Sequence, residues 1–424
     1  MQRRTYDVVV VGAGIVGSAT AYHLARAGQS VALIDRSGVA AEASDAGAGM
    51  LTPLAEAGAS DLSDPLLRLG LAGLRHYERL EAQLESETGM WAGLVHLPTL
   101  YPAFDDQQAG ALRRDLPALQ SLRPELRWLE ADEVRQREPL LAPGVRGAIL
   151  SPAEGNVTIG HLTRLLVRAA QLHGAELLIP RSALALLWDG ARVQGVVTEE
   201  NPIEARHVVL ATGAWSSAWS DRDQQAGIVY PLKGQLLALR PSGQPLRHTI
   251  YAGPLGYLVP KADGSVFVGA TSERRGFDKT PTAGGLIQLL EVVQRVTPAL
   301  KEASVERTWA GLRPVSVDGL PFIGEAPSSP GLWLAVGHGR VGAITGPVTG
   351  FIIAELIQGR PVPYDLDLRP FAPERLGSWR RRLTPLGAAE TGGRQLELFS
   401  QPAEASQPGE AVAQEDQVNR REQP

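Results

Sequence analysis

A glycine-rich turn close to the start of the chain is the first stretch with residues suited to chemistry. Residues 12–17, with the sequence Gly-Ala-Gly-Ile-Val-Gly, follow the β-branched run Tyr6–Val11 and lead into a segment with helical spacing. In such a turn Gly12 allows a tight bend, Gly14 lets the backbone approach a pyrophosphate, and Gly17 lets the helix pack on the sheet. Amides at the helix N-terminus then favour negative phosphates. The pattern predicts a dinucleotide site, with a chance glycine turn as the alternative.

An acidic residue ends the next strand-like run. Ser30–Ile34 is followed by Asp35, which stands 18 residues after Gly17. A carboxylate at that place accepts hydrogen bonds from ribose hydroxyls and disfavours a 2′-phosphate, and its alternative role is to form the turn at the strand end. The adjacent Arg36 leaves an NADP-type site open. Because nicotinamide and flavin enzymes share this fold, the turn alone does not choose between them.

Two more glycine-containing segments favour a flavin. Residues 206–210 form a β-branched strand that runs into Ala-Thr-Gly, ending at Gly213, and this resembles the second flavoprotein signature, where the chain passes close to the cofactor. Residues 337–342 (Gly-His-Gly-Arg-Val-Gly) lead into an apolar helical segment, Pro347–Ile357. The helix N-terminus would stabilise the negative charge of a reduced flavin. The alternatives are an ordinary core strand with a glycine turn and a glycine-rich link between a strand and a helix.

The elements that must position these segments fall into two groups. Buried parallel strands with helices are expected around the glycine turn, and Ile159–His173 is one of the expected helices. Residues 257–260 and 265–270, joined by the turn 261–264, instead indicate a hairpin of an antiparallel sheet. The predicted fold class is therefore α/β (α+β overall), a Rossmann-like FAD-binding domain with a second, mainly antiparallel-sheet substrate domain. The expected boundaries are 1–80, 150–220 and 320–373 for the FAD-binding domain, 81–149 and 221–319 for the substrate domain, and 387–424 for a disordered tail.

Composition narrows the classes of function. The chain has 424 residues, of which 44% are apolar and 21% charged, and its net charge is −5. These values exclude wholesale disorder and give no electrostatic footprint for nucleic acid or an anionic membrane. Cysteine is absent, so disulfides, thiolate metal sites, a cysteine nucleophile and a flavin tethered through sulfur are excluded. No metal site is expected, no apolar run reaches the roughly 18 residues of a membrane span, and a cytoplasmic location is expected.

Four motifs make the chain similar to a known family. They are 44–51 (Ser-Asp-Ala-Gly-Ala-Gly-Met-Leu), 231–235 (Pro-Leu-Lys-Gly-Gln), 308–314 (Thr-Trp-Ala-Gly-Leu-Arg-Pro) and 318–324 (Asp-Gly-Leu-Pro-Phe-Ile-Gly). Together with the glycine segments, they resemble the D-amino-acid oxidase family of flavoproteins, and within it the glycine oxidase branch linked to thiamine biosynthesis. The resemblance covers about residues 5–372. It implies an amine-oxidising reaction and an FAD cofactor, which is held non-covalently because cysteine is absent.

The resemblance also implies which residues contact the cofactor, in addition to the glycines of the turns. The segment 338–344 is expected to contact the cofactor through its backbone, and His338 is expected to be structural rather than a base. The implied contacts are Ile15, Val16, Asp35 and Arg36 at the adenosine and pyrophosphate, Ala43, Ser44, Ala48, Gly49 and Met50 at the flavin ring, Ala183 at the adenine, and His338, Gly339, Arg340, Val341, Gly342, Ala343 and Ile344 at the flavin pyrimidine.

Three side chains are implied at the substrate. Arg313 matches an arginine that grips the substrate carboxylate, Tyr257 a tyrosine that assists it, and Arg340 a second arginine near the bound acid. An arginine fork suits a carboxylate because it offers two parallel donors. The alternatives are a structural ion pair for Arg313, a core residue for Tyr257 and a loop anchor for Arg340. Residues 252–256 (Ala-Gly-Pro-Leu-Gly) make this wall less polar than in relatives, which leaves the exact substrate open.

The implied reaction is FAD-dependent oxidative deamination of glycine, sarcosine and small D-amino acids to the imine or 2-oxo acid, with ammonia and hydrogen peroxide as products. No side chain is needed as a catalytic acid or base, since placing the reacting C–H bond at the flavin supplies much of the catalysis. Molecular oxygen is the expected acceptor, a thiazole synthase is the expected partner for the imine, and a homo-oligomer is open. The alternatives are a D-amino-acid dehydrogenase that uses a quinone or protein acceptor, and a non-catalytic flavin-binding subunit of an assembly.

Overall fold

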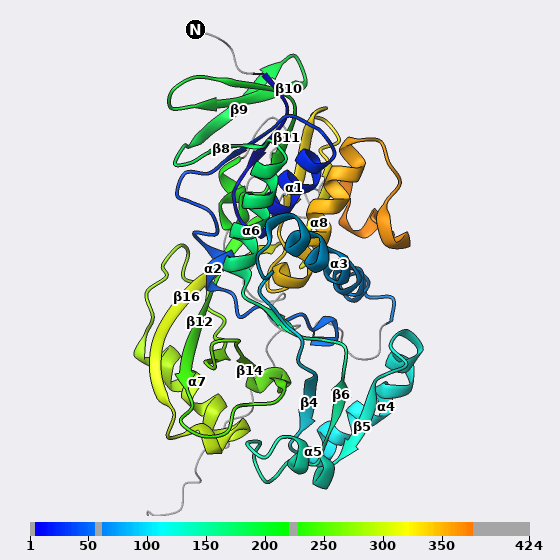
Figure 1. The fold of residues 1–424 in the computed structure, drawn as a ribbon, viewed down its shortest axis with the longest axis vertical. Coiled ribbons are helices and arrows are strands. Elements are labelled where there is room, and N and C mark those ends of the chain that lie inside the picture. Colours follow the sequence, from blue (N-terminus) through cyan, green and yellow to red (C-terminus); the bar gives the residue numbers. More distant parts are fainter. Residues whose placement is uncertain (1–4, 56–61, 220–227, 376–424) are drawn as a thin grey trace, which may run out of the picture. The chain divides into compact units, whose positions relative to one another are not determined.

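A computed structural model describes residues 5–55, 62–219 and 228–375 (Figure 1). The predicted tail, residues 387–424, lies outside the described residues. The described strands form two large sheets and one two-stranded sheet. The three glycine segments follow strands of the first large sheet, whereas Arg313 and Tyr257 lie on strands of the second.

The first sheet has a parallel core of buried strands. Its strands are β1 (Thr5–Val11), β2 (Val31–Ile34), β8 (Glu176–Leu178), β9 (Ala183–Asp189), β10 (Arg192–Thr198), β11 (Ile203–Leu210), β17 (Phe322–Glu325) and β18 (Leu332–Val336). They pair in the order β17-β18-β11-β1-β2-β8, with β17 antiparallel, and β10 and β9 extend the sheet from β11. Val8 to Val10 of β1 are fully buried, as expected of a strand covered on both faces.

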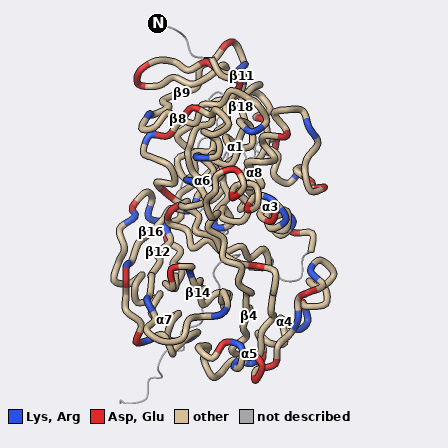
Figure 2. The backbone as a smooth tube through the Cα atoms, viewed as in Figure 1, with Lys and Arg blue, Asp and Glu red and all other residues tan. Residues whose placement is uncertain are grey.

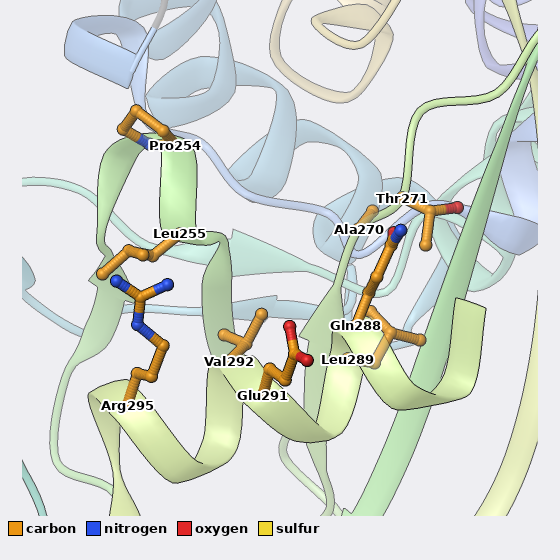
Figure 3. A pocket seen from close by; sticks show the side chains of 9 residues that line it. All are labelled: Pro254, Leu255, Ala270, Thr271, Gln288, Leu289, Glu291, Val292 and Arg295. Carbon is orange, nitrogen blue, oxygen red and sulfur yellow. The ribbon is translucent and has the colours of Figure 1, made fainter. Parts of the chain in front are cut away.

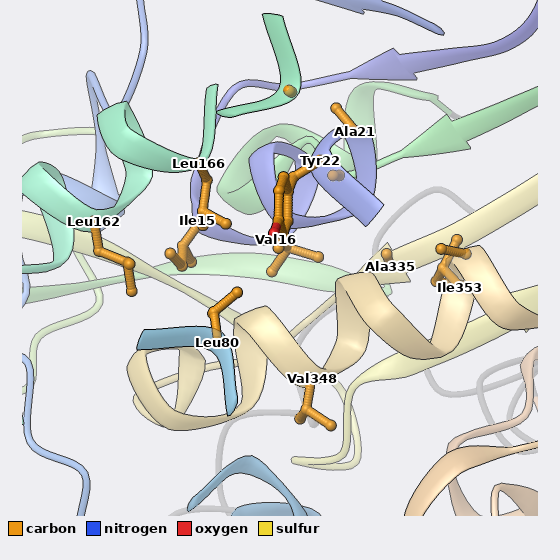
Figure 4. Packing of buried hydrophobic residues seen from close by; sticks show 14 of the residues in the cluster. Ile15, Val16, Ala21, Tyr22, Leu80, Leu162, Leu166, Ala335, Val348 and Ile353 are labelled. Carbon is orange, nitrogen blue, oxygen red and sulfur yellow. The ribbon is translucent and has the colours of Figure 1, made fainter. Parts of the chain in front are cut away.

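Four helices share one apolar core with this sheet. They are α1 (Ile15–Arg26), α3 (Pro65–Thr88), α6 (Ile159–Leu172) and α8 (Gly342–Ile357). Figure 4 shows Ile15 of α1 near Leu162 and Leu166 of α6. α1 and α8 approach very closely, because a Cβ on Gly350 would lie 2.5 Å from the backbone nitrogen of Thr20. Nearer the beginnings of both helices, a Cβ on Gly346 would lie 2.9 Å from Ile15 Cγ2, so the two N-terminal turns are also close.

The second sheet is mainly antiparallel. Its strands are β4 (Thr99–Ala103), β5 (Arg127–Glu130), β6 (Gly147–Ser151), β12 (Val229–Arg240), β13 (Thr249–Tyr251), β14 (Tyr257–Pro260), β15 (Val266–Gly269) and β16 (Ser304–Ser316). They pair in the order β16-β12-β15-β14-β13-β4-β6-β5. Among these pairs β13 and β4 run parallel, and the others run antiparallel.

The two faces of β12 have different neighbours. Leu237 packs in an apolar cluster with Leu289 of helix α7 (Ala283–Val296), and we call this side of the sheet the back face. Leu236 packs instead in a cluster with Met50 and Tyr257, and we call this side the front face. Because side chains alternate along a strand, the two faces can serve different purposes.

The remaining elements connect the two sheets or flank the second one. The short helix α2 is important for the site because it carries two predicted cofactor residues. These elements are α2 (Ala43–Ala46), α4 (Asp106–Leu122), α5 (Ala131–Arg137) and the two-stranded sheet of β3 (Leu94–Val95) and β7 (Asn156–Val157).

The predicted fold class is confirmed: the protein is a mixed α/β fold with a parallel and a mainly antiparallel sheet. The predicted hairpin is confirmed as β14 and β15, and the predicted helix over 159–173 as α6. The strands of the first sheet lie in the segments predicted for the FAD-binding domain. The division into two discontinuous domains at the stated boundaries stays a prediction.

The second predicted helix N-terminus differs from the expectation. α8 begins at Gly342, five residues before the proline at which the sequence pattern placed its start. Pro347 has no N–H, so it leaves the carbonyl of Ala343 without its helical partner. The phenol of Tyr77 on α3 donates to that carbonyl at 2.6 Å. A side chain from another helix therefore allows the proline within α8.

Charge and hydropathy add little to the localisation of function. Figure 2 shows residues of both signs interspersed along the described backbone. Within the part of the chain that the structure describes, no helix is both long and apolar enough to cross a membrane.

Candidate functional site

Three glycine segments meet at one edge of the first sheet. β1, β11 and β18 run parallel, so the segments 12–17, 211–213 and 337–341, which follow them, lie beyond the same carboxyl ends. Two of these segments touch, because a Cβ on Gly12 would lie 2.4 Å from the carbonyl oxygen of Ala211. α1 and α8 both begin at this edge, and the first-turn amides of a helix have no intrahelical acceptor. The structure thus brings together segments that the sequence predicted separately.

The turn 12–17 is shaped by its glycines. Gly12 has φ of +109°, and a Cβ on Gly17 would lie 1.9 Å from the carbonyl oxygen of Gly12. Both positions therefore need glycine for the turn itself. Gly14 differs, because its φ is −78° and the nearest atom to a Cβ there is Ser44 Oγ, at 3.1 Å. Outside its chain neighbours, no other atom lies within 4 Å of that Cβ position, so the backbone at Gly14 can be approached by a ligand.

Asp35 ends β2 and holds the glycine turn. Its Oδ2 accepts from the backbone N–H of Ala13 at 2.9 Å. Its Oδ1 accepts from the N–H groups of Ser37 at 2.8 Å and Gly38 at 3.1 Å. The role of turn former, which the sequence left as an alternative, is therefore observed. A carboxylate has about four acceptor positions, so one stays available for a ribose hydroxyl.

Ala183 and Arg36 flank Asp35. The backbone N–H of Arg181 donates to the carbonyl of Asp35 at 2.9 Å, and Ala183 follows as the first residue of β9. The guanidinium of Arg36 lies 4.6 Å from the centre of the Trp215 ring, two residues beyond Gly213. The residues predicted at the adenosine end therefore lie in one neighbourhood, and Arg36 is exposed there.

α2 brings Ala43 and Ser44 against the start of α1. The buried Ser44 Oγ accepts from the backbone N–H of Ile15 at 2.9 Å. α2 is also held by the second sheet, because Trp309 Nε1 on β16 donates to the carbonyl of Ala46 at 2.9 Å. The motif around Ser44 and the motif around Trp309 are therefore in contact.

Residues 48–50 are held from two sides. Gly49 has φ of +82°, and a Cβ there would lie 1.8 Å from the carbonyl oxygen of Val157, so a larger residue does not fit. The buried Lys261 Nζ donates to the carbonyls of Ala48 at 3.0 Å and Val157 at 3.1 Å. Burial lowers the pKa of Lys261 to about 8. A buried ammonium therefore lies directly behind the segment predicted to face the flavin.

The loop before α8 has a structural histidine. His338 is buried, and its Nε2 lies 3.0 Å from Thr349 Oγ1. Burial lowers the pKa of His338 to about 4, so the ring is neutral at pH 7 and only weakly basic. Gly339 N–H donates to the carbonyl of Pro314 at 2.8 Å, which joins this loop to the end of β16. Residues 341–344 follow as the beginning of α8.

These groups fit an FAD-sized dinucleotide. The turn at Gly14 gives a backbone approach without a side chain, and the N-termini of α1 and α8 offer amides to the phosphates and the flavin. Asp35 has acceptor capacity at the ribose end. The close packing at Gly49 leaves backbone as the surface of that segment. The residues that could hold the cofactor are therefore those that the sequence named.

Arg313 is seated on the front face by glycines. A Cβ on Gly234, in the neighbouring strand β12, would lie 2.4 Å from Arg313 Nη2, so this glycine makes room for the guanidinium. Arg313 Nη1 donates to the carbonyl of Thr271 at 3.0 Å. None of the carboxylates that the structure describes pairs with Arg313, so the alternative of a structural ion pair finds no partner among them. A Cβ on Gly269 would likewise lie 2.3 Å from the Tyr257 phenol oxygen.

Tyr257 and Arg340 lie near this guanidinium. Burial raises the pKa of Tyr257 above its usual value, while its hydrogen bond with Arg313 and the charge of Arg340 oppose the rise. The phenol is therefore protonated at neutral pH and can donate. Arg340 is exposed, and its effect on Tyr257 places its charge close to the same site. The structure brings together the three residues predicted at the substrate.

A separate cavity lies on the α7 side of the second sheet. Its volume is about 220 Å³. Figure 3 shows Leu255 opposite Arg295, with Thr271 at the far end of the same cavity. Arg313, Tyr257 and Arg340 do not line it, so it is distinct from the predicted substrate site. Leu255 belongs to the less polar segment 252–256 that the sequence identified.

Several functional residues were missed by the sequence analysis. Lys261 was assigned to the polar turn of a hairpin, where a lysine is normally solvent-exposed, but it is buried. Lys233, Gln235 and Glu273 form a hydrogen-bonded group behind Arg313. The signal available was the motif 231–235, which places a lysine and a glutamine on one face of an otherwise apolar strand.

Comparison with protein families gives one match that covers most of the chain. The model of the family named DAO, described as FAD dependent oxidoreductase, matches residues 7–356. This range includes the glycine turn, the buried Lys261, Arg313 and the loop before α8.

Relatives and a solved structure agree with that match. The chain is 32% identical to the glycine oxidase of Geobacillus kaustophilus over 85% of this chain and 95% of that protein. It is 35% identical to the glycine oxidase of Pseudomonas aeruginosa, over 86% and 98% of the two chains. It is 34% identical to the bifunctional protein ThiO/ThiG of a Nostoc species, over 83% of this chain and 53% of that one. The crystal structure of the Geobacillus kaustophilus glycine oxidase superposes with a TM-score of 0.81, covering 87% of this chain and 98% of that one. The chain therefore belongs to the DAO family of FAD dependent oxidoreductases, and its cofactor is FAD.

Proposed function

We propose that this protein oxidises glycine, and with it sarcosine and small D-amino acids, with molecular oxygen as the electron acceptor. One observation carries the proposal: the guanidinium of Arg313 is seated over Gly234 and tied to the carbonyl of Thr271, on the front face that also carries Tyr257 and contacts Met50. A positive fork beside the flavin-facing segment is suited to hold an amino acid by its carboxylate.

The proposed cofactor contacts follow the geometry of the edge. Gly12, Gly14 and Gly17 with Ile15 and Val16 would receive the diphosphate at the N-terminus of α1. The amides at the beginning of α8 would face the flavin pyrimidine, where a helix N-terminus stabilises negative charge. The other contacts in the proposal are Asp35, Arg36 and Ala183 at the adenosine, Gly213 beside the diphosphate, and Ala43, Ser44, Ala48, Gly49 and Met50 at the ring.

In the proposed reaction, the side chains of the protein hold the substrate in place. Arg313 would bind the carboxylate with two parallel donors, and the protonated phenol of Tyr257 would add a third. Arg340, near the same site, would add positive charge. When bound, FAD supplies the two-electron acceptor chemistry that amine oxidation needs. Fixed placement of the α-carbon is worth several kcal/mol of the barrier, so no catalytic acid or base is required.

The proposed overall reaction balances with oxygen as its oxidant and needs no further redox partner. Glycine loses two hydrogens to give the imine, water hydrolyses the imine to the 2-oxo acid and ammonia, and oxygen takes up the two hydrogens as hydrogen peroxide. The names of the relatives from Geobacillus kaustophilus and Pseudomonas aeruginosa, glycine oxidase, support glycine as the preferred amine.

A partner that consumes the imine is part of the proposal. The Nostoc relative is a bifunctional ThiO/ThiG protein, about half of which aligns with this chain. We infer that this protein delivers the imine of glycine to a thiazole synthase for the thiazole part of thiamine. The short lifetime of an imine in water would make transfer to such a partner useful.

The test is an assay of the purified, FAD-loaded protein with matched amines. Glycine, sarcosine and D-alanine should each release hydrogen peroxide with equal consumption of oxygen, and ethylamine, which has no carboxylate, should be a poor substrate. Reduction of an added quinone without oxygen consumption would favour a D-amino-acid dehydrogenase instead. Lack of turnover with every amine and acceptor would overturn the proposal and leave a non-catalytic flavin-binding subunit as the remaining alternative.

The same preparation tests how the cofactor is held. Because cysteine is absent, acid precipitation should leave a colourless pellet and a yellow supernatant. A yellow pellet would indicate a covalent link through another side chain.

A further inference from the structure

Five polar residues at the back face of the second sheet contact one another through hydrogen bonds and, for Lys233, an ion pair with Glu273, and we call them the back-face network. The network consists of Lys233, Gln235, Thr271, Glu273 and Thr282.

Gln235 is the centre of this network. It is 2% exposed, and its amide Nε2 donates to Glu273 Oε1 at 2.6 Å and to Thr282 Oγ1 at 3.0 Å. Its amide Oε1 accepts from the backbone N–H of Thr282 at 2.8 Å. A Cβ on Gly285, the third residue of α7, would lie 2.3 Å from the Gln235 amide, so the helix leaves room for it. The side chain is thus held in one orientation.

Thr271 connects the network to the carboxylate anchor. Its Oγ1 donates to Glu273 Oε1 at 2.6 Å and accepts from the backbone N–H of Gln235 at 2.9 Å. Its carbonyl oxygen accepts from Arg313 Nη1 at 3.0 Å. The side chain of Thr271 therefore belongs to the network, while its carbonyl orients the guanidinium.

Lys233 and Glu273 complete the charge balance. Lys233 is fully buried, its Nζ donates to the carbonyl of Thr280 at 2.6 Å, and it lies 3.9 Å from Glu273 Oε2 and 3.5 Å from Asp278. Burial raises the pKa of Glu273, but the hydrogen bonds from Thr271 and Gln235 and the charge of Lys233 outweigh it and lower that pKa below its usual value. Glu273 is therefore ionised at neutral pH and accepts strongly.

We propose that Gln235 and Glu273 are positioning residues for the carboxylate anchor, because they hold Thr271 where its carbonyl sets the orientation of Arg313. The inference rests on the proposed function for the identity of the bound acid. An arginine side chain has several rotatable bonds, and a bidentate fork loses its advantage when its plane turns. A network behind the sheet removes that freedom without placing a competing carboxylate in the substrate site.

The experiment compares Glu273→Ala with wild type in the FAD-loaded protein. The probe is glycolate, which has the carboxylate of glycine and a hydroxyl in place of its amine, and binding is followed by the change in flavin absorbance. Glu273→Ala should weaken glycolate binding and raise the KM for glycine about tenfold, with kcat changed less than about twofold. FAD content and the oxidation of ethylamine should stay as in wild type.

Two further variants separate positioning from general damage. Glu273→Gln keeps an oxygen that can accept from Thr271 and Gln235, so it should recover most of the glycolate affinity. Thr271→Val keeps the carbonyl but removes the hydroxyl, so it should weaken glycolate binding about threefold even if Glu273→Ala fails to fold. Lys279→Ala is the matched control. It lies on the same segment as Glu273 and removes only an ion pair with Glu42, so it should change neither the glycolate affinity nor the KM for glycine.

The outcomes distinguish this inference from the proposed function. Equal glycolate affinity in wild type, Glu273→Ala and Thr271→Val would overturn the positioning role, whatever the reaction. Equal losses for glycine and ethylamine, with loss of FAD, would overturn it in favour of a structural role. If the variants bind glycolate more weakly as expected, but the wild-type protein does not oxidise glycine, the positioning role is supported and the proposed reaction is overturned.

Discussion

At the edge of the first sheet, the groups proposed to face the cofactor are backbone amides at Gly14 and at the beginnings of α1 and α8. On the second sheet, the group proposed to face the substrate is the side chain of Arg313. The amides are placed by backbone conformation, which needs glycine at a few positions. The guanidinium is placed by two neighbours, through the space at Gly234 of β12 and the carbonyl of Thr271, which follows β15.

This difference predicts that substitutions on the two sheets have different effects. A change at the first sheet should alter cofactor binding and leave substrate preference alone. A change at the second sheet should alter recognition of the carboxylate and leave FAD bound. Variants on each sheet therefore show whether the two halves of the site are independent.

The largest effect is expected for Gly14→Val. A Cβ at Gly14 would meet no backbone atom of another segment within 4 Å, but it would lie 3.1 Å from Ser44 Oγ, so a small shift of that side chain is needed for the variant to fold. The valine side chain would then occupy the approach of the diphosphate. The dissociation constant of FAD, measured by fluorescence titration of the apoprotein, should rise about a hundredfold. Gly110→Val is the control, since a Cβ there meets open space. Unchanged FAD affinity in Gly14→Val would show that the diphosphate lies elsewhere.

A smaller effect is expected for Gly234→Ala on the second sheet. The added methyl would lie 2.4 Å from Arg313 Nη2 and would displace the guanidinium. The kcat/KM for glycine should fall about tenfold to a hundredfold, because an error of about 1 Å in placement has an effect of that size on the rate. FAD content should not change. Gly243→Ala, where a Cβ has open space, should behave as wild type. Loss of FAD in Gly234→Ala would show that the halves are coupled.

The pH dependence of stability tests the loop that leads into α8. Burial lowers the pKa of His338 to about 4, below the usual 6.5, so between these values the unfolded state binds more protons and stability falls as the pH falls. The contribution is about 2 kcal/mol between pH 7 and pH 5. Denaturant unfolding of wild type and His338→Gln should therefore converge as the pH falls over this range. Parallel curves would show that His338 is not buried as a neutral ring.

The smallest effect is expected for Tyr77→Phe. This change removes the hydrogen bond to the carbonyl of Ala343, which Pro347 leaves without a helical partner, and should lower the free energy of unfolding by about 1 kcal/mol. In the double variant Tyr77→Phe with Pro347→Ala, the restored N–H can bond that carbonyl, and stability should recover. A double variant no more stable than Tyr77→Phe would contradict this explanation of the proline.

The parts of the site made of backbone could be predicted from the sequence. A glycine turn after a β-branched strand indicates both a backbone conformation and cofactor binding. The segments at Gly12, Gly213 and Gly337 were therefore recognised although they lie far apart in the chain. The start of α8 was predicted wrongly, because the partner that permits Pro347 is Tyr77, far away in the chain. Short-range pattern cannot show such a partner.

The parts made of buried side chains were predicted only in outline. Arg313 was named from its motif, but its orientation depends on Thr271, which lies 42 residues earlier in the chain. Lys261 stands in a turn, where a lysine is normally exposed, and the motif around Gln235 indicates a polar residue in an apolar strand without showing its partners. Their roles appear only when the sheets bring distant segments together, which is a property of tertiary packing rather than of local sequence.

Paired titrations of Arg313→Met with FAD and with glycolate test the central claim most directly. The account predicts that the dissociation constant of FAD stays within about twofold of wild type, while glycolate affinity falls by about a hundredfold, since a charge-assisted pair and its geometry are both lost. Arg313→Lys should recover little, because an ammonium lacks the fork. Equal weakening of FAD and glycolate in Arg313→Met would contradict the account, because the arginine would then support the fold or the cofactor rather than the carboxylate.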